Sequence, residues 1–270
     1  MPIEDTDLNL FQATGAPPLP PAAVAGRLEH EGARIWYATC GDGPPVFLLH
    51  GGLGHSGNWG YQVPALVNAG YRAVLIDSRG HGRSSRDRRP YSYELMAGDA
   101  LAVMDRLALE QGYFVGWSDG ACTALTLAAT QPSRTAGVFF FACNMDPTGA
   151  REMQPAPRID RCFARHRQDY AALSATPDGF EDFVAAVTEM MRTQPNYSAD
   201  DLRAIAVPVD IVLGEQDEFI KRDHAVYLAS NIPGATLTIL PGVSHFAPLQ
   251  RPALFNQAVL SFLDRLTATR

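Results

Sequence analysis

The chain has 270 residues, of which 46% are hydrophobic and 19% charged, and its formal net charge is −7. This composition is typical of a soluble globular protein and excludes disordered, collagen-like and coiled-coil chains. A net-acidic chain is poorly suited to phosphate backbones, so we expect neither a nucleic-acid nor a membrane partner. The apolar run Val138–Cys143 is also far shorter than the roughly 20 residues of a membrane-spanning helix.

The start of the chain predicts an extended N-terminal arm over residues 1–26, because it contains five prolines and little periodicity. Its first residues, MPIEDTDLNL, lack the basic and apolar regions of a secretory signal. The four cysteines form no CxxC pair, and we expect buried free thiols at Cys40, Cys122, Cys143 and Cys162. Together these features favour the cytoplasm.

Beyond the arm, short apolar runs alternate with longer stretches of helical periodicity. Most of the short runs lack polar–apolar alternation, as do strands that are buried on both faces of a parallel sheet. The predicted strands are Ala33–Thr39, Val46–His50, Tyr71–Asp77, Tyr113–Trp117, Gly137–Ala142, Val209–Leu213 and Thr236–Leu240. The predicted helices are 57–69, 92–110, 119–131, 221–230 and 252–266. This alternation predicts an α/β fold with a mostly parallel sheet of about eight strands and helices on both faces.

One segment interrupts the alternation. Residues 144–200 contain several prolines and helical patterns but no convincing strand. We therefore expect a core formed by 27–143 and 201–270, with a helical cap inserted at 144–200. Ligands of open α/β sheets bind beyond the carboxyl ends of the strands, so such a cap would cover the site.

The strongest motif is Gly116-Trp117-Ser118-Asp119-Gly120, which follows one predicted strand and opens the next predicted helix. A G-x-S-x-G sequence in this context is typical of a nucleophile elbow, whose tight turn projects the serine hydroxyl from the sheet. The alternative is a serine that merely caps an ordinary helix. Ser118 is the candidate nucleophile.

A hydroxyl nucleophile needs a base, and the base needs an acid that orients it. Acidic residues follow the strand VDIVLG, and Asp217 is the candidate acid because it stands in a G-x-x-D position counted from Gly214. His245 follows the next strand and is the candidate base. Three candidate groups therefore follow three predicted strands, in the order nucleophile, acid, base.

A glycine-rich turn, His50-Gly51-Gly52-Leu53-Gly54, follows another strand. Such a turn lets backbone N–H groups approach a substrate oxygen, and we assign the oxyanion hole to the N–H groups of Gly52 and Asp119. Substrate-binding candidates are Asp119, Leu53 and Trp117. A phosphate cradle is the alternative, but the GK[ST] sequence of a phosphate-binding loop is absent from this turn.

From about residue 27 to residue 270 the sequence resembles the lidded α/β-hydrolase superfamily. The stretches that carry the resemblance are LLHGGLGHSGNW, VLIDSRGHGRSS, GWSDGACTALTLA, VLGEQDEF and VSHFAPLQRP. Within the superfamily, GWSDG is similar to the valacyclovir hydrolase (biphenyl hydrolase-like) group. That resemblance implies that Asp119 holds the amino group of amino-acid esters, although Ala121 stands where such sequences commonly have a second glycine.

These features predict a serine hydrolase that cleaves a small organic ester or lactone through an acyl-enzyme on Ser118, without a cofactor. Two alternatives stay open: a C–C bond hydrolase of vinylogous diketones, and a ligand sensor that turns over slowly. We expect a small-molecule substrate and no metal, since no HExxH or similar spacing occurs; a homo-oligomer stays open. The arginines of the cap either form a solvated face or bind a substrate carboxylate. His30, His166 and His224 are expected at the surface.

Overall fold

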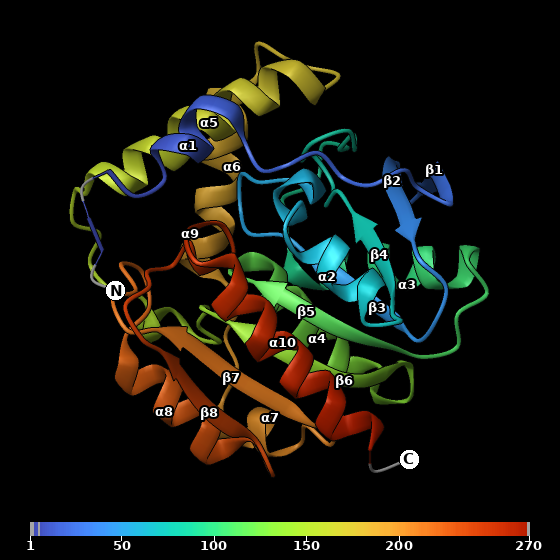
Figure 1. Cartoon of the computed structure of the whole chain (residues 1–270), viewed down its shortest axis with the longest axis vertical. Helices are drawn as coiled ribbons and strands as arrows, with labels where there is room; N and C mark the ends of the chain where they lie inside the picture. The colour runs from blue at the N-terminus through green and yellow to red at the C-terminus, as the bar shows by residue number, and fades with distance from the viewer. Residues whose placement is uncertain (1–2, 5, 269–270) are drawn as a thin grey trace.

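The computed structural model describes residues 3–4 and 6–268, and its central element is an eight-stranded sheet (Figure 1). The strand order is β1-β2-β4-β3-β5-β6-β7-β8, in which β2 pairs antiparallel with β1 and with β4, and the other pairs are parallel. The strands are β1 (Val24–His30), β2 (Ala33–Cys40), β3 (Pro45–Leu49), β4 (Arg72–Ile76), β5 (Gly112–Trp117), β6 (Thr135–Phe141), β7 (Val209–Gly214) and β8 (Thr236–Leu240). The predicted fold class is confirmed.

The inner strands are apolar because both of their faces are covered. Every residue of β5, β6 and β7 is buried, which explains why these strands show no polar–apolar alternation in the sequence. Aromatic rings fill the space between strands and helices, as where Phe47 stacks on Phe114 with 4.9 Å between ring centroids. This rigid centre carries the turns from which the candidate catalytic residues project.

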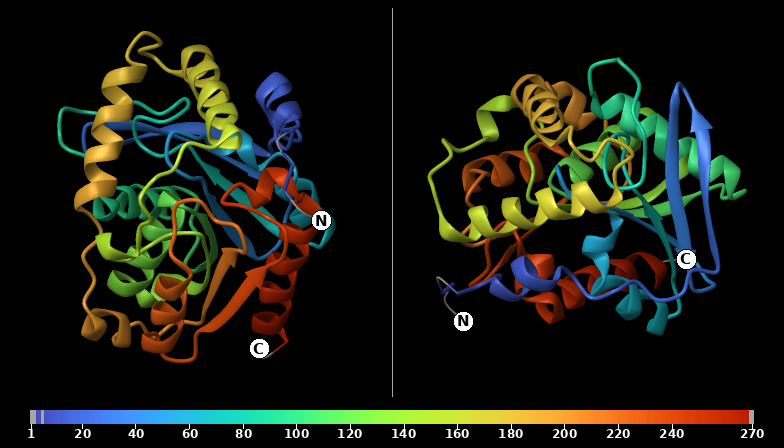
Figure 2. Two further views of the ribbon diagram at one scale, coloured as in Figure 1. Left: turned by 90° about the vertical axis from the view of Figure 1, so that its left-hand side faces the viewer. Right: turned by 90° about the horizontal axis from the view of Figure 1, so that it is seen from above.

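Helices cover both faces of the sheet (Figures 1 and 2). One face is covered by α2 (Gln62–Asn68) and α10 (Pro252–Thr267), and the other by α3 (Tyr93–Arg106), α4 (Asp119–Thr130) and α8 (Arg222–Asn231). The short helices are η1 (Ser56–Trp59), η2 (Pro132–Arg134), η3 (Pro147–Gly149), α7 (Ala199–Arg203) and α9 (Ala247–Gln250). The long helices lie close to the ranges that the periodicity predicts.

The segment between β6 and β7 contains η3 and two long helices, α5 (Pro157–Leu173) and α6 (Phe180–Thr193). Both helices lie to one side of the sheet, apart from the helices that cover its faces (Figures 1 and 2). Each buries an apolar stripe, which includes Ile159 and Tyr170 of α5 and Phe183 of α6. No strand is assigned in this segment, in which every residue is described.

The N-terminal arm is less extended than the sequence predicts, and its residues 1, 2 and 5 lie outside the described residues. Asn9–Thr14 form helix α1, which packs beside α5 and buries Phe11 there, with 6.1 Å between the ring centroids of Phe11 and His166. The arm ends where β1 begins, at Val24. Strand β1 is an edge strand with no fully buried residue, so it has no apolar run from which the sequence could predict it.

Candidate active site

Ser118 lies at the sharp turn between β5 and α4, with φ 55° and ψ −126°. This backbone conformation is unfavourable for any residue with a side chain, and it persists only where the surroundings enforce it. The neighbouring glycines are required by close packing: a Cβ atom on Gly116 would collide with the backbone of Ala121, and one on Gly120 with the carbonyl of Leu49. The turn is therefore built to project the hydroxyl group of Ser118 into the space beyond the sheet.

Asp217 and His245 form a hydrogen-bonded pair. His245 Nδ1 lies 2.9 Å from Asp217 Oδ2, and both side chains are almost completely buried. The other carboxylate oxygen, Oδ1, accepts the backbone N–H groups of Phe219 (2.9 Å) and Ile220 (2.8 Å). These bonds fix the carboxylate, which in turn orients the imidazole ring.

The environment favours the protonated form of His245. Burial alone would lower the pKa of the imidazole, but the charge of Asp217 and its hydrogen bond outweigh burial and raise the pKa above the ordinary value. Glu218 and Asp119 add smaller contributions in the same direction. A base in this setting has a stabilised cation, which is what a group that accepts a proton during catalysis requires.

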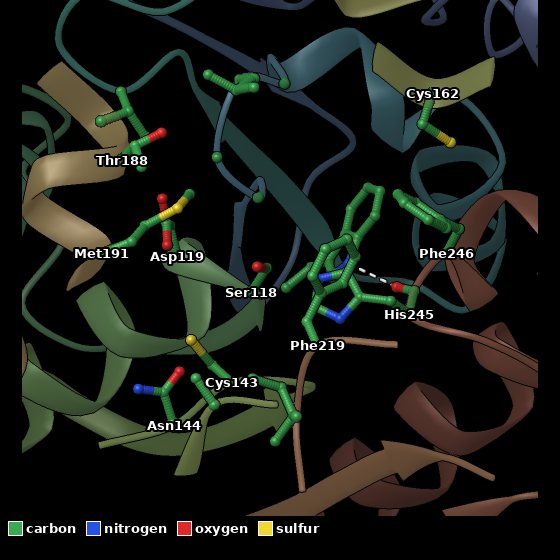
Figure 3. A pocket seen from close by; sticks show the side chains of 18 of the residues that line it. Ser118, Asp119, Cys143, Asn144, Cys162, Thr188, Met191, Phe219, His245 and Phe246 are labelled. Carbon is green, nitrogen blue, oxygen red and sulfur yellow. Dashed lines mark hydrogen bonds between the residues drawn. The ribbon is translucent and has the colours of Figure 1, made fainter. Parts of the chain in front are cut away.

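Two further contacts hold the backbone of His245. Its carbonyl accepts a hydrogen bond from Trp117 Nε1 at 2.8 Å, drawn as the dashed line in Figure 3. Its N–H donates to Glu218 Oε2 at 3.0 Å. The residue before the candidate nucleophile and the residue after the candidate acid thus both position the candidate base.

A cavity of about 270 Å³ opens above these groups, and its wall is mostly apolar. The core contributes Ser118 and His245, and the inserted helices contribute Phe163, Val187 and Met191. Figure 3 shows the labelled side chains around this space. The cavity is large enough for a small organic molecule. A molecule bound there would contact both the inserted helices and the candidate nucleophile.

The glycine-rich turn after β3 also lines the cavity. Leu53 takes a left-handed conformation with φ 64°, and Gly54 N–H bonds back to the Gly51 carbonyl at 3.1 Å. His50 stabilises the turn, because its Nδ1 lies 2.8 Å from the Gly51 carbonyl and its Nε2 accepts the N–H of Ser78 at 3.0 Å. Gly52 faces the start of α4, where a side chain would collide with Asp119.

Asp119 is buried beside the candidate nucleophile, and its two oxygens differ. Oδ1 accepts a hydrogen bond from the Tyr93 hydroxyl at 2.8 Å. Oδ2 is shielded from solvent and has no hydrogen-bond partner among the described residues. Burial raises the pKa of the Asp119 carboxyl to about 6, against the smaller lowering effects of Tyr93 and His245.

Six of the seven sequence-predicted site residues therefore line one cavity, namely Gly52, Leu53, Trp117, Ser118, Asp119 and His245. Asp217, the seventh, lies behind His245 and contacts its imidazole ring. Residues 46–258 match the model of a family described as "Alpha/beta hydrolase family". The chain belongs to the α/β-hydrolase family.

Similar proteins agree with this family and differ in what they act on. "Serine hydrolase BPHL" of Mus musculus is 28% identical over 254 residues, which cover 90% of this chain and 87% of the mouse protein. A "2-hydroxy-6-oxononadienedioate/2-hydroxy-6-oxononatrienedioate hydrolase" of Comamonas testosteroni is 25% identical and covers 85% and 91% of the two chains. The solved structure "Est816 as an N-Acyl homoserine lactone degrading enzyme" is 27% identical, with a TM-score of 0.70 and coverage of 88% and 100%.

Two arginines of the inserted segment contact the acid loop of this α/β hydrolase. Arg151 Nη1 donates to the Asp217 carbonyl at 2.9 Å, and Arg158 forms an ion pair with Glu218. The sequence predicts neither of these contacts. Arg167 pairs with Glu181 at the surface, as a solvated face requires.

Two histidines that the sequence places at the surface are buried. His166 of α5 lines the cavity, and burial lowers the pKa of its imidazole to about 3. His224 of α8 accepts the N–H of Met145 at 3.0 Å. Both histidines lie in helices with many charged residues, so the sequence alone does not predict their burial. The sequence does not point to Tyr93 or Met191, because no local motif marks them, and it places Glu218 among the acidic residues after β7 without predicting its contact with His245.

All four cysteines of the hydrolase are buried and free, as predicted. Among the described residues, no group of three or more His, Cys, Asp or Glu side chains could hold a metal ion. Within 3–4 and 6–268, no helix has both the length and the apolar character that crossing a membrane demands.

Proposed function

We propose that this α/β hydrolase is a serine hydrolase that cleaves a small organic ester or lactone through an acyl-enzyme formed on Ser118. The observation that carries the proposal is that His245, hydrogen-bonded to Asp217 behind it, lines the same apolar cavity as Ser118, a serine in a strained elbow. The similarity to a serine hydrolase and to a lactone-degrading enzyme supports the same reaction class.

In the proposed reaction, His245 takes the proton of Ser118 as the hydroxyl attacks the substrate carbonyl. Asp217 holds the imidazole in the required orientation and stabilises the cation that forms. His245 then protonates the leaving alcohol, and a water molecule attacks the acyl-enzyme by the same route. The raised pKa of His245 supports this cycle, because it matches the role of a proton acceptor.

The negative charge that develops on the carbonyl oxygen would be held by the backbone N–H groups of Gly52 and Asp119. Asp119 N–H lies at the start of α4, where the helix dipole also favours negative charge. Gly52 has no side chain to obstruct this approach, and its neighbourhood leaves no room for one. Leu53 and Trp117 would contact the substrate, since both line the cavity.

We further propose that the favoured esters are those of amino acids. Asp119 directly follows Ser118 in the chain. Its Oδ1 is bonded to Tyr93, but its Oδ2 has no partner within the described part of the chain and is available to a cation. A substrate ammonium would satisfy it with a charge-assisted hydrogen bond. The inserted segment 144–200 would act as the cap, because its helices form one wall of the cavity.

The test of the serine mechanism is Ser118→Ala with p-nitrophenyl acetate and butyrate as substrates. We expect kcat to fall by on the order of 10⁴–10⁶ with the fold unchanged by circular dichroism. A variant that kept a tenth of the activity would overturn the assignment of the nucleophile. Wild-type turnover that is negligible on every ester would favour the ligand sensor instead.

The test of amino-acid specificity compares kcat/KM for valine benzyl ester with that for benzyl 3-methylbutanoate, which lacks only the amine. A substrate ammonium held by Asp119 should favour the amino ester roughly tenfold or more, and Asp119→Asn should abolish this preference. Equal rates on the two esters in the wild type would contradict the proposal.

A C–C bond hydrolase of vinylogous diketones is the second candidate function. One observation favours it: Arg151, a cation, lines the cavity and could attract a substrate carboxylate. The similarity to the Comamonas testosteroni hydrolase is consistent with this reading. Cleavage of a 2-hydroxy-6-oxo-dienoate faster than any ester, with loss of that preference in Arg151→Gln, would make it the main activity.

A further inference from the structure

The unpartnered oxygen of Asp119 is covered by one side chain of the inserted segment. A Cβ atom built on Gly52 would collide both with Met191 Cε and with Asp119 Oδ2, so these two atoms lie side by side above Gly52. Figure 3 shows the Met191 side chain beside the Asp119 carboxylate, at the edge of the cavity that Ser118 shares. An apolar methyl group therefore occupies the place where a cation would bind.

This arrangement is costly for the carboxylate as it stands. Oδ2 is shielded from solvent and receives no hydrogen bond from the described residues, so its negative charge is not compensated on that side. The Tyr93 hydroxyl compensates only Oδ1. A ligand cation that replaced the methyl group would recover the missing interaction.

Met191 is suited to move. It lies on α6 with 36% of its surface exposed, whereas its neighbour Met190 is 2% exposed and fixed in the core. A methionine side chain is unbranched and adopts many rotamers at little cost. Its tip can therefore turn outward without displacing the helix that carries it.

We propose that Met191 is a movable shutter over the Asp119 carboxylate and thereby sets the preference for amino esters over neutral esters. The inference rests on the proposed function and names the residue that regulates its amine subsite. With the shutter closed, the cavity presents an apolar wall and accepts neutral acyl groups. With the shutter open, Oδ2 accepts a hydrogen bond from a substrate ammonium next to Ser118. Because only the open state binds the amine, the closed fraction weakens amine binding in proportion.

The experiment measures the ratio of kcat/KM for valine benzyl ester to that for benzyl 3-methylbutanoate in Met191→Ala. We expect the ratio to rise about five- to tenfold over wild type, because the truncated side chain no longer covers Oδ2. Met191→Leu, which keeps a covering side chain, should leave the ratio at or below the wild-type value. An equal change of kcat/KM for both esters in Met191→Ala would overturn this proposal for Met191.

Two controls separate this effect from a general change of the cavity. Thr188 lines the same cavity one turn earlier on α6, and Thr188→Ala should change the two esters by the same factor. In an Asp119→Asn background, Met191→Ala should no longer raise the ratio. A rise that persisted without the carboxylate would show that Met191 acts through shape alone, and would overturn the proposal.

A binding measurement keeps the inference testable if the esters prove to be poor substrates. In Ser118→Ala protein, which cannot turn over, calorimetry gives the Kd values of L-valinamide and 3-methylbutanamide. Met191→Ala should tighten the binding of L-valinamide about fivefold or more and leave 3-methylbutanamide unchanged. Tightening of both, or of neither, would reject the shutter whatever reaction Ser118 catalyses.

Discussion

Asp217 and Glu215 are close in sequence but have different partners. Asp217 bonds to the His245 ring, whereas Glu215 Oε2 accepts the N–H of Gly242 at 2.7 Å, in the turn after β8. Asp217→Asn should therefore lower kcat by on the order of 10⁴, because an amide favours the wrong imidazole tautomer. Glu215→Gln keeps an acceptor oxygen and should cost less than about tenfold. Steady-state kinetics on p-nitrophenyl butyrate measure the two losses of kcat. A larger loss in Glu215→Gln than in Asp217→Asn would assign the acid role to Glu215.

In the proposed mechanism, the titration of His245 sets the acid limb of the pH–rate profile. Only the neutral imidazole can accept the proton of Ser118, so kcat/KM should rise with pH through the pKa of His245. Since that pKa is raised, the midpoint should lie above about 6.5, the ordinary value for histidine. A midpoint below 6.5 in the free enzyme would contradict this electrostatic picture.

At the scale of residues, the sequence is informative where chemistry requires a local motif. Ser118 stands in a five-residue pattern, and Asp217 and His245 each follow a strand, so all three could be named as candidates from the sequence. Tyr93 and Met191 could not, because they reach the site from α3 and α6, far from the motif in sequence. Their roles depend on which faces these helices turn inward, and periodicity alone does not give that for a cavity wall.

Helix α5 is linked to the candidate base by a chain of contacts. Arg158 pairs with Glu218, and Glu218 accepts the N–H of His245. Because the charge of Glu218 raises the pKa of His245, Glu218→Gln should shift the acid limb to lower pH. Arg158→Gln leaves that charge without its partner and should shift the limb to higher pH. The pH dependence of kcat/KM in the two variants tests the pair of opposite shifts; shifts of the same sign would show that the link does not act electrostatically.

At the scale of elements, the buried parallel strands and the long amphipathic helices were predictable because their burial requires apolar runs or a helical spacing of apolar residues in the sequence. Strand β1 and helix α1 have no such pattern. All seven residues of β1 are at least partly accessible, and of the described helix α1 residues only Phe11 is buried. Both elements are held by pairing and packing with segments that the sequence alone does not place beside them.

The N-terminal arm connects distant parts of the molecule. Phe11 of α1 packs beside α5, and Asp7 accepts a hydrogen bond from Gln250 Nε2 at 2.9 Å, near the start of α10. The arm therefore packs against the inserted helix α5 and is also bonded to the core, so it links the two. Phe11→Ala should lower the free energy of unfolding by roughly 3 kcal/mol and raise KM for benzyl esters more than for p-nitrophenyl acetate. Chemical denaturation and the two KM values check this, and equal KM changes would confine the arm to a structural role.

The backbone of Ser118 has a consequence for the stability of the whole molecule. A serine held at φ 55° and ψ −126° carries strain of about 1–3 kcal/mol that a glycine would not. Glycine loses more entropy on folding, at a cost of about 0.5–1 kcal/mol, so part of the strain relief should remain as net stabilisation. The variant Ser118→Gly, which lacks the proposed nucleophile, should thus melt at a higher temperature than the wild type, and Ser118→Ala should not. Calorimetry gives the melting temperatures of the three proteins. A Ser118→Gly variant that melts no higher than the wild type would show that the backbone of the candidate nucleophile does not lower the thermal stability of the chain.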